Sequence, residues 1–221
     1  MPGARLIHLV DAAKSFAHAG ASPQVILLPG TISLPTDGRL AVLAARKAGK
    51  TTLLQLLAGA LRPDGGAVLG ADLMSPAVNA GPLMHPGLSA VENVRFLARA
   101  YGFSADGLLA AAVALAGSDL LLDRPLKTQD GAKRRNFECA TTFVIPFGCY
   151  LVDEIGLVDQ DVMARCFALA RHRQAGVIFT TSQPRLAMQH AQAAVTLRDG
   201  VLRLFAEPRD AVEDHEGGRQ G

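Results

Sequence analysis

The chain has 221 residues, of which 49% are hydrophobic and 19% charged, so it can form one large or two small buried cores. This composition excludes a disordered chain, a collagen-like repeat and a coiled coil. The 22 Lys and Arg and the 20 Asp and Glu leave a formal net charge of +2, which gives no electrostatic reason to expect a nucleic acid as partner. Aromatic residues make up only 5%, with no Trp, which argues against a surface that stacks bases.

Neither a membrane span nor a secretory signal is evident along the chain. The longest apolar stretch, around 108–116, is far shorter than the roughly 20 residues that a spanning helix needs. The first 15 residues lack the apolar run of a signal peptide. Three cysteines (Cys139, Cys149, Cys166) form no Cys-x-x-Cys pair. We therefore expect a reduced, cytoplasmic chain with no transmembrane segment of its own.

Short apolar runs alternate with longer helical patterns along the chain. The predicted strands are 6–10, 25–28, 40–44, 67–69, 149–152, 177–181, 194–197 and 201–205. The predicted helices are 51–61, 90–101, 105–116, 134–143, 160–173 and 185–191, with a long loop over 72–88 and a polar, frayed tail over 207–221. This order predicts an α/β fold with a mainly parallel sheet flanked by helices. It also predicts an N-terminal antiparallel portion, a helical subdomain over about 90–145 and one domain over 1–206.

A motif typical of phosphate binding lies between a predicted strand and a predicted helix. Residues 44–51 read Ala-Ala-Arg-Lys-Ala-Gly-Lys-Thr and match GxxxxGK[ST] except at the first glycine. Backbone N–H groups at the helix start, together with the helix dipole, favour an anion there. Lys50 is then expected to reach the outer phosphates, Thr51 to hold Mg²⁺ through its hydroxyl, and Thr52 to lie near the inner phosphates. The predicted fold is therefore of the P-loop NTPase type.

Two positions of this loop depart from the usual pattern. Ala44 stands at the first glycine, and Lys47 stands where many such loops have a second one. A left-handed backbone at Lys47 costs roughly 1–2 kcal/mol, so a distorted loop is expected. The alternative is that the Gly49-Lys50-Thr51 triplet opens a helix by chance. Ala48 completes the set of predicted phosphate-binding positions.

A pair of carboxylates follows the apolar strand 149–152. Asp153 is expected to hold Mg²⁺, directly or through water, and Glu154 to orient or polarise an attacking water. The carboxyl ends of parallel strands share one edge of the sheet, so both can meet the residues around Lys50. The alternative is a solvated strand end with two ordinary acids.

Several segments resemble the ATP-binding subunits of ABC transporters, and in particular the subfamily that exports capsular polysaccharide. The resemblance rests on residues 51–59 with the turn at 62–66, on 87–102, and on 149–154. It runs over roughly residues 5–205 and is specific in the order and spacing of these segments.

The resemblance implies a function and a set of partners. It implies that two ATP-binding subunits, as a homodimer or heterodimer, close on ATP and Mg²⁺ and drive a membrane permease that moves a polysaccharide. It places the chain at the inner face of the cell membrane, with each site made by the loop of one subunit and the signature segment of the other. Asp159 matches the family's D-loop aspartate. Phe16 falls where an aromatic often stacks on adenine, although an ordinary core or strand-end role is an equal alternative.

The resemblance also identifies departures at positions that support hydrolysis. The Gln-loop position falls at Ala80, which carries no oxygen in its side chain. The signature region reads Thr-Gln-Asp-Gly-Ala over 128–132, so the predicted contacts Asp130 and Gly131 include a carboxylate facing a phosphate. Gln183 occupies the switch-histidine position and cannot become cationic.

These departures leave two alternatives beside an active ATPase. One is a degenerate subunit that binds ATP without hydrolysing it and pairs with, or regulates, an active partner. The other is a small-molecule kinase built on the same loop, for which Arg124, Arg134 and Arg135 would be lid residues. The late position of Asp153 and Glu154 does not suit the kinase.

Overall fold

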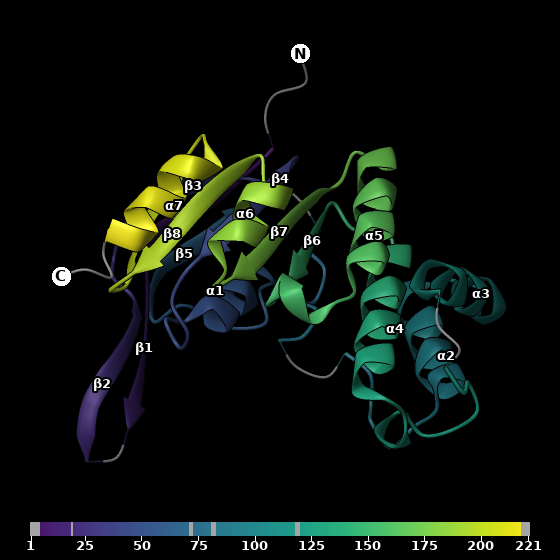
Figure 1. Ribbon diagram of the computed structural model, residues 1–221. Helices are drawn as coiled ribbons and strands as arrows, with labels where there is room; N and C mark the ends of the chain where they lie inside the picture. The colour runs from purple at the N-terminus through teal and green to yellow at the C-terminus, as the bar shows by residue number, and fades with distance from the viewer. Residues whose placement is uncertain (1–4, 19, 71–72, 81–82, 118–119, 218–221) are drawn as a thin grey trace.

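The computed structural model describes residues 5–18, 20–70, 73–80, 83–117 and 120–217. Two β-sheets form the body of the molecule, and a block of helices lies to one side of it (Figure 1). The sheet order and the helices confirm the predicted α/β fold with an antiparallel portion and a helical region.

The larger sheet is mainly parallel and has the order β6-β7-β4-β8-β9. Its strands are β4 (Arg39–Leu43), β6 (Cys149–Val152), β7 (Gly176–Thr181), β8 (Ala193–Arg198) and β9 (Val201–Phe205). Strand β9 pairs antiparallel with β8, and the other pairs are parallel. The carboxyl ends of β4, β6 and β7 therefore meet at one edge of the sheet.

The smaller sheet is antiparallel and is organised around β1. Its strands are β1 (Leu6–His18), β2 (Ala21–Leu27), β3 (Ile32–Pro35) and β5 (Gly65–Gly70). Strand β1 pairs with all three of the others. Its far end and β2 form a hairpin that extends away from the body (Figure 1).

Seven α-helices complete the described structure. They are α1 (Lys50–Leu57), α2 (Ala90–Tyr101), α3 (Ala105–Ala116), α4 (Gly131–Val144), α5 (Gln160–His172), α6 (Pro184–His190) and α7 (Pro208–Gly217). Short 3-10 turns lie at Leu126–Thr128 and Ile155–Leu157. Among the described residues, no helix has the length and apolar character needed to cross a membrane.

Alternating residues of the parallel strands face two different cores, as the period of two in a strand requires. On β4, Leu40 and Val42 join a core with α1 and the antiparallel sheet, whereas Ala41 joins the core with the helices of the other face. On β6, Leu151 and Tyr150 divide in the same way. Both faces of the parallel sheet are therefore covered, so its exposed functional groups are confined to its edges.

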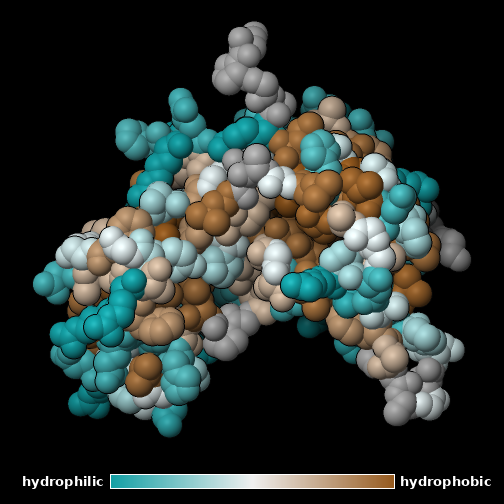
Figure 2. Space-filling view, turned by 180° about the vertical axis from the view of Figure 1, so that it is seen from behind, coloured by the Kyte–Doolittle hydropathy of each residue, from teal (hydrophilic) through white to brown (hydrophobic). Residues whose placement is uncertain are grey.

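The back of the molecule carries a gathering of apolar side chains, which Figure 2 shows in brown. A hollow of about 540 Å³ lies between the end of α1 and strand β5 and is lined in part by Leu57, Leu61, Val68 and Leu73. Leu73 is 65% exposed, which is unusual for so large an apolar side chain.

Three predictions about local structure need correction. The predicted loop over 72–88 contains two parallel bridges to β6, from Met74 to Cys149 and from Val78 to Val152. Strand β3 was not predicted. Residues 208–217 form helix α7 and not a frayed tail, because Ala211 and His215 are buried.

The three cysteines are buried, and none of them forms a disulfide within the described residues. The Sγ atoms of Cys139 on α4 and Cys166 on α5 lie 4.0 Å apart, and their hydrogen bond, together with burial, raises the pKa of the Cys139 thiol. This arrangement joins the two helices without a covalent bond.

Candidate functional site

The loop between β4 and α1 has the backbone of a phosphate cradle. Gly49 lies at φ +99°, and a Cβ built there would come within 2.5 Å of the Ile26 Cγ2 on β2. Because only glycine combines that φ with that absence of side chain, the position accepts no other residue without strain. The Gly49 carbonyl accepts the Leu53 N–H at 2.9 Å and so opens α1.

The two unusual loop positions differ in their consequence. Ala44 is fully buried, is not among the positive-φ residues, and donates its N–H to the Thr181 carbonyl at 3.3 Å. The expected distortion is therefore absent at Ala44. Lys47 has φ +65°, so the left-handed backbone expected there is present.

The start of α1 differs from the starts of α2 to α5 and resembles that of α6, because its N-cap residue provides no side-chain hydrogen bond. Helices α2, α3, α4 and α5 each have an N-cap side chain that accepts backbone N–H groups. The N-cap of α1 is Gly49, which provides no such acceptor, and the first turn contains no acidic residue. The first N–H groups of α1 and the positive end of its dipole are thus left for an anion.

Lys50 is buried at the base of this loop. Its Nζ contacts the carbonyls of Ala44 at 3.1 Å and Ala45 at 2.9 Å, and the Glu154 Oε1 at 3.0 Å. Only 5% of the Lys50 side chain is exposed, against 34% for Glu154. The structure thus brings together the lysine and one of the two carboxylates that the sequence analysis selected.

Asp153 is held by two hydroxyl groups. Its Oδ2 accepts from the Thr51 hydroxyl at 2.5 Å, and its Oδ1 accepts from the Thr180 hydroxyl at 2.6 Å. Thr180 also accepts the Glu154 N–H at 2.8 Å, and Glu154 has a left-handed backbone at φ 46°. The sharp turn after β6 directs the two acids to different partners.

A pocket of about 320 Å³ opens above the loop. Residues from the β1–β2 hairpin line it on one side, and those from the loop, the start of α1 and the β6 edge line it on the other: Phe16, Gln24, Ile26, Lys47, Gly49, Lys50, Thr51, Thr52 and Glu154. Phe16 is 36% exposed, and the Lys14 Nζ lies 5.3 Å from its ring centroid. An exposed aromatic ring and a phosphate cradle thus share one pocket.

Three other residues named in the sequence analysis are not among the described residues that line this pocket. Gln183 follows β7 and caps the start of α6, and a Cβ built on Gly156 would meet its Nε2 at 3.4 Å. Ala80 accepts a hydrogen bond from Gln55 Nε2 through its carbonyl at 3.4 Å. Asp159 caps α5 by accepting the N–H groups of Asp161 and Val162.

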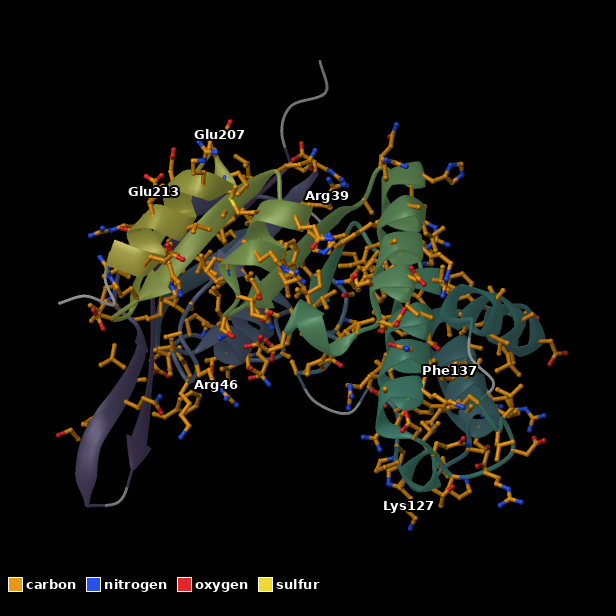
Figure 3. The ribbon with its side chains drawn as sticks, in the orientation of Figure 1. Arg39, Arg46, Lys127, Phe137, Glu207 and Glu213 are labelled. Carbon is orange, nitrogen blue, oxygen red and sulfur yellow. The ribbon has the colours of Figure 1, made fainter. Side chains whose placement is uncertain are left out.

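Asp130 and Gly131 lie at the start of α4, and none of the described residues that line the pocket comes from that helix. Figure 3 labels Arg46 in the loop and Lys127 just before Asp130, and shows them on separate parts of the molecule. The Asp130 Oδ1 accepts the Lys133 N–H at 3.0 Å and the Ala132 N–H at 2.9 Å, and these bonds lower its pKa. Asp130 therefore fills the anion position at the start of its own helix.

Three residues around the site were not selected from the sequence. Thr180 holds Asp153, and Gln24 donates to the Lys47 carbonyl at 3.4 Å. Asn79 donates to the Asp153 carbonyl at 3.0 Å. One of these residues has a signal in the local sequence. Thr180 and Thr181 are a polar pair at the end of the otherwise apolar strand β7, which could have marked Thr180 as a residue of the site.

The donor set suits a hydrated magnesium ion. Thr51 and Asp153 offer oxygen atoms only, and no group of three or more His, Cys, Asp or Glu side chains in the described part of the chain could hold a metal by itself. Magnesium is commonly bound by one or two protein oxygens together with phosphates and water. The uncapped start of α1 and the left-handed backbone at Gly49 fit the phosphates.

Comparisons with known proteins point to one family. A scan against protein-family models finds no match. The capsule polysaccharide export ATP-binding protein CtrD of Neisseria meningitidis serogroup B is 25% identical, over 79% of this chain and 82% of its own length. A polysialic acid transport ATP-binding protein KpsT of Escherichia coli is 26% identical, over 84% of this chain and 87% of its own length.

A third relative and a solved structure agree with these two. The cytochrome c biogenesis ATP-binding export protein CcmA of Cupriavidus necator is 32% identical, over 76% of this chain and 79% of its own length. A solved ATP-binding subunit of an ABC transporter shares the fold with a TM-score of 0.72 at 17% identity, over 98% of this chain and 95% of that one. With the phosphate loop, the paired acids and these relatives, the chain belongs to the ATP-binding subunits of ABC transporters.

Proposed function

We propose that this chain binds ATP with Mg²⁺ and, together with a membrane permease, supports the export of a polysaccharide. The observation that carries the nucleotide part is a pair of contacts: Lys50 lies 3.0 Å from Glu154, and Thr51 lies 2.5 Å from Asp153. Lys50, Thr51 and Glu154 line one pocket. Two of the residues open α1 and the other two directly follow β6, about a hundred positions later in the chain, so chance proximity does not explain the match to the motif.

Each residue has a role that its contacts support. The first N–H groups of α1 bind phosphate oxygens, and Lys50 exchanges its carbonyl and Glu154 contacts for the outer phosphates. Thr51 and Asp153 hold the metal, which would neutralise phosphate charge when bound. Glu154 is left to hold a water, and Phe16 offers its ring to a base across the pocket.

The polysaccharide is proposed from the relatives. CtrD is named for capsule polysaccharide export and KpsT for polysialic acid transport, and this chain covers more than four fifths of each of them. A permease partner, and with it a position at the inner face of the membrane, follows from membership of the family. The apolar hollow beside α1, with Leu73 largely exposed, offers surface that a partner could cover.

Calorimetry with the purified chain tests the nucleotide part. ATP with Mg²⁺ should bind to the wild type, and the K50A variant should bind it at least tenfold more weakly. The reason is that Lys50 is the one buried cationic side chain among the described residues that line the pocket. Equal affinities would refute the proposed site. For the transport part, cells that carry K50A in place of the wild type should lose surface polysaccharide while the variant remains folded.

A second function is favoured by one observation. Asp130 occupies the N–H groups of residues 132 and 133 with its own carboxylate, so the start of α4 is not a ready phosphate contact. A degenerate subunit that binds ATP without hydrolysing it would show tight binding and a turnover equal to that of K50A. The kinase alternative is not supported, because none of Arg124, Arg134 and Arg135 is among the described residues that line the pocket. Arg135 donates instead to the Leu157 carbonyl at 3.3 Å.

A further inference from the structure

Phe16 lies on the part of β1 that extends away from the body of the molecule (Figure 1). Strand β1 pairs with β5 as far as Ala13, opposite Gly65. From Lys14 onward its partner among the described strands is β2, where Gln24 lies opposite Phe16. The position of the Phe16 ring therefore depends on how β1 is held at the point where it leaves β5.

Asp64, in the turn that leads from α1 to β5, holds β1 at this point. Its backbone N–H donates to the Ala13 carbonyl at 2.8 Å. Its Oδ1 accepts a hydrogen bond from the Lys14 Nζ at 2.6 Å, and its Oδ2 accepts the Ser15 N–H at 2.8 Å. The Ser15 hydroxyl lies 3.4 Å from the same Oδ2. One residue thus binds all three positions that precede Phe16 in the strand.

Lys14 connects this carboxylate to the aromatic ring. Its Nζ lies 5.3 Å from the centroid of the Phe16 ring, within the range of a cation–π contact. Only 11% of the Lys14 side chain is exposed, against 45% for Asp64. Phe16 lines the pocket above the phosphate loop, and Lys14 is not among the described residues that do. The ammonium group therefore contacts the ring from a side other than the pocket, and the pocket side is left for a base.

We propose that Asp64 is a positioning residue for the base of the nucleotide and acts through Lys14 and Phe16. This inference rests on the proposed function and adds one residue to it. The phosphates bind at the start of α1, and Asp64 lies in the turn that follows the same helix. A short stretch of chain thus connects the phosphate site with the aromatic ring. The competing explanation is that Asp64 stabilises the fold and has no effect on the base.

Two ligands that differ in the base separate these explanations. Inorganic tripolyphosphate has the three phosphates of ATP but neither base nor sugar. The ratio of ATP affinity to tripolyphosphate affinity therefore measures what the base side of the pocket contributes. A general loss of folded protein weakens the binding of both ligands and leaves this ratio unchanged. Calorimetry with Mg²⁺ measures both affinities, and the melting temperature of each variant measures its stability.

The variants are F16A, D64A and the double variant F16A/D64A. The ratio should fall about tenfold in F16A, within the usual range for a base stacked on an aromatic side chain. It should fall roughly threefold in D64A, the size expected when the ring remains but the cation beside it is no longer held. The double variant should have the ratio of F16A, because Asp64 then has no ring to position.

D11N is the matched control, because it removes one negative charge from the same strand. The Asp11 Oδ1 lies 3.5 Å from the Thr31 hydroxyl, on the part of β1 that stays within the body. Asparagine tolerates the left-handed backbone that Asp11 has at φ 46°. The ratio in D11N should equal that of the wild type.

Several results would overturn the inference. A wild-type ratio in D64A would show that Asp64 acts on the fold alone. A double variant that loses the product of the two single losses would show that Asp64 acts independently of Phe16. A loss in D11N equal to that in D64A would show a general effect of charge.

Failure of the proposed function is recognised without any Asp64 variant. If the wild type binds neither ligand, the nucleotide site is wrong, and if F16A keeps the wild-type ratio, Phe16 does not contact the base. Either result also removes the inference. If D64A does not fold, D64N takes its place. It removes the charge that holds Lys14 but keeps an oxygen for the Ser15 N–H, and it should also lower the ratio.

Discussion

Replacing Thr180 by Val removes a single hydroxyl from the support of both acids while keeping the side-chain shape. That hydroxyl donates to Asp153 Oδ1 at 2.6 Å and accepts the Glu154 N–H at 2.8 Å, and Thr180 is fully buried. Loss of a hydrogen bond to a charged group costs about 1.5–3 kcal/mol, and a buried N–H left unsatisfied costs about 1–3 kcal/mol. We expect T180V to lower the free energy of unfolding by about 2.5–6 kcal/mol, a large part of the ~5–15 kcal/mol of a typical protein.

Urea denaturation at neutral pH measures this difference. T180S keeps the hydroxyl and should lose only about 1 kcal/mol for the missing methyl group. T196V is the matched control on β8: its hydroxyl donates to Asp214 Oδ2 at 2.8 Å, and Asp214 retains Arg203 at 3.1 Å. T196V should therefore cost less than T180V. If T180V is no less stable than T180S, the hydroxyl does not support the acids and the reasoning fails.

Three further predictions follow from other parts of the structure. G49A should lose about 2–4 kcal/mol of unfolding free energy from the left-handed backbone and the contact with Ile26, which is itself buried; in urea denaturation, the loss in the double variant G49A/I26A should be smaller than the sum of the losses in G49A and I26A, and strictly additive losses would contradict the contact. The raised pKa of Cys139 keeps its thiol protonated, so alkylation in the native protein at pH 8 should be far slower than in urea; equal rates would show that the thiol is accessible. The lowered pKa of Asp130 means that its stabilising contribution is present above the unfolded value of about 4 and is lost as pH falls through the lower folded value. D130N should therefore flatten the fall of melting temperature between pH 5 and 3, and an unchanged slope would contradict this.

The centre of the site could be predicted from the sequence because the order of strands and helices is enough to bring its residues together. A lysine that opens a helix after one parallel strand and a carboxylate that ends another must meet if both strands lie in one sheet. Strands β4 and β6 do lie in one sheet, separated only by β7, and Thr51 contacts Asp153. The alternation of apolar runs with helical patterns was enough to predict that sheet.

The supporting residues could not be predicted because their partners are distant in the chain. Asn79 lies in a stretch whose backbone hydrogen bonds go to β6, more than seventy residues away, so nothing local distinguishes it from a loop. Helix α7 is polar along most of its length and reads as a tail. Its stability comes from the burial of Ala211 and His215 and from Asp214, which accepts hydrogen bonds from β8 and β9.

The internal contacts of Lys50 have a consequence for how strongly this protein holds a nucleotide. Without a ligand, the ammonium group already has three oxygen partners, so a triphosphate must displace some of them. The binding free energy then contains only the difference between the new contacts of Lys50 with phosphate and the contacts that it loses. Of those competitors Glu154 alone belongs to a side chain, and it is also the group expected to hold water. Any substitution of Glu154 therefore changes both how tightly the nucleotide binds and how the attacking water is held. A change in the turnover of a Glu154 variant can be interpreted only when its nucleotide affinity is measured as well.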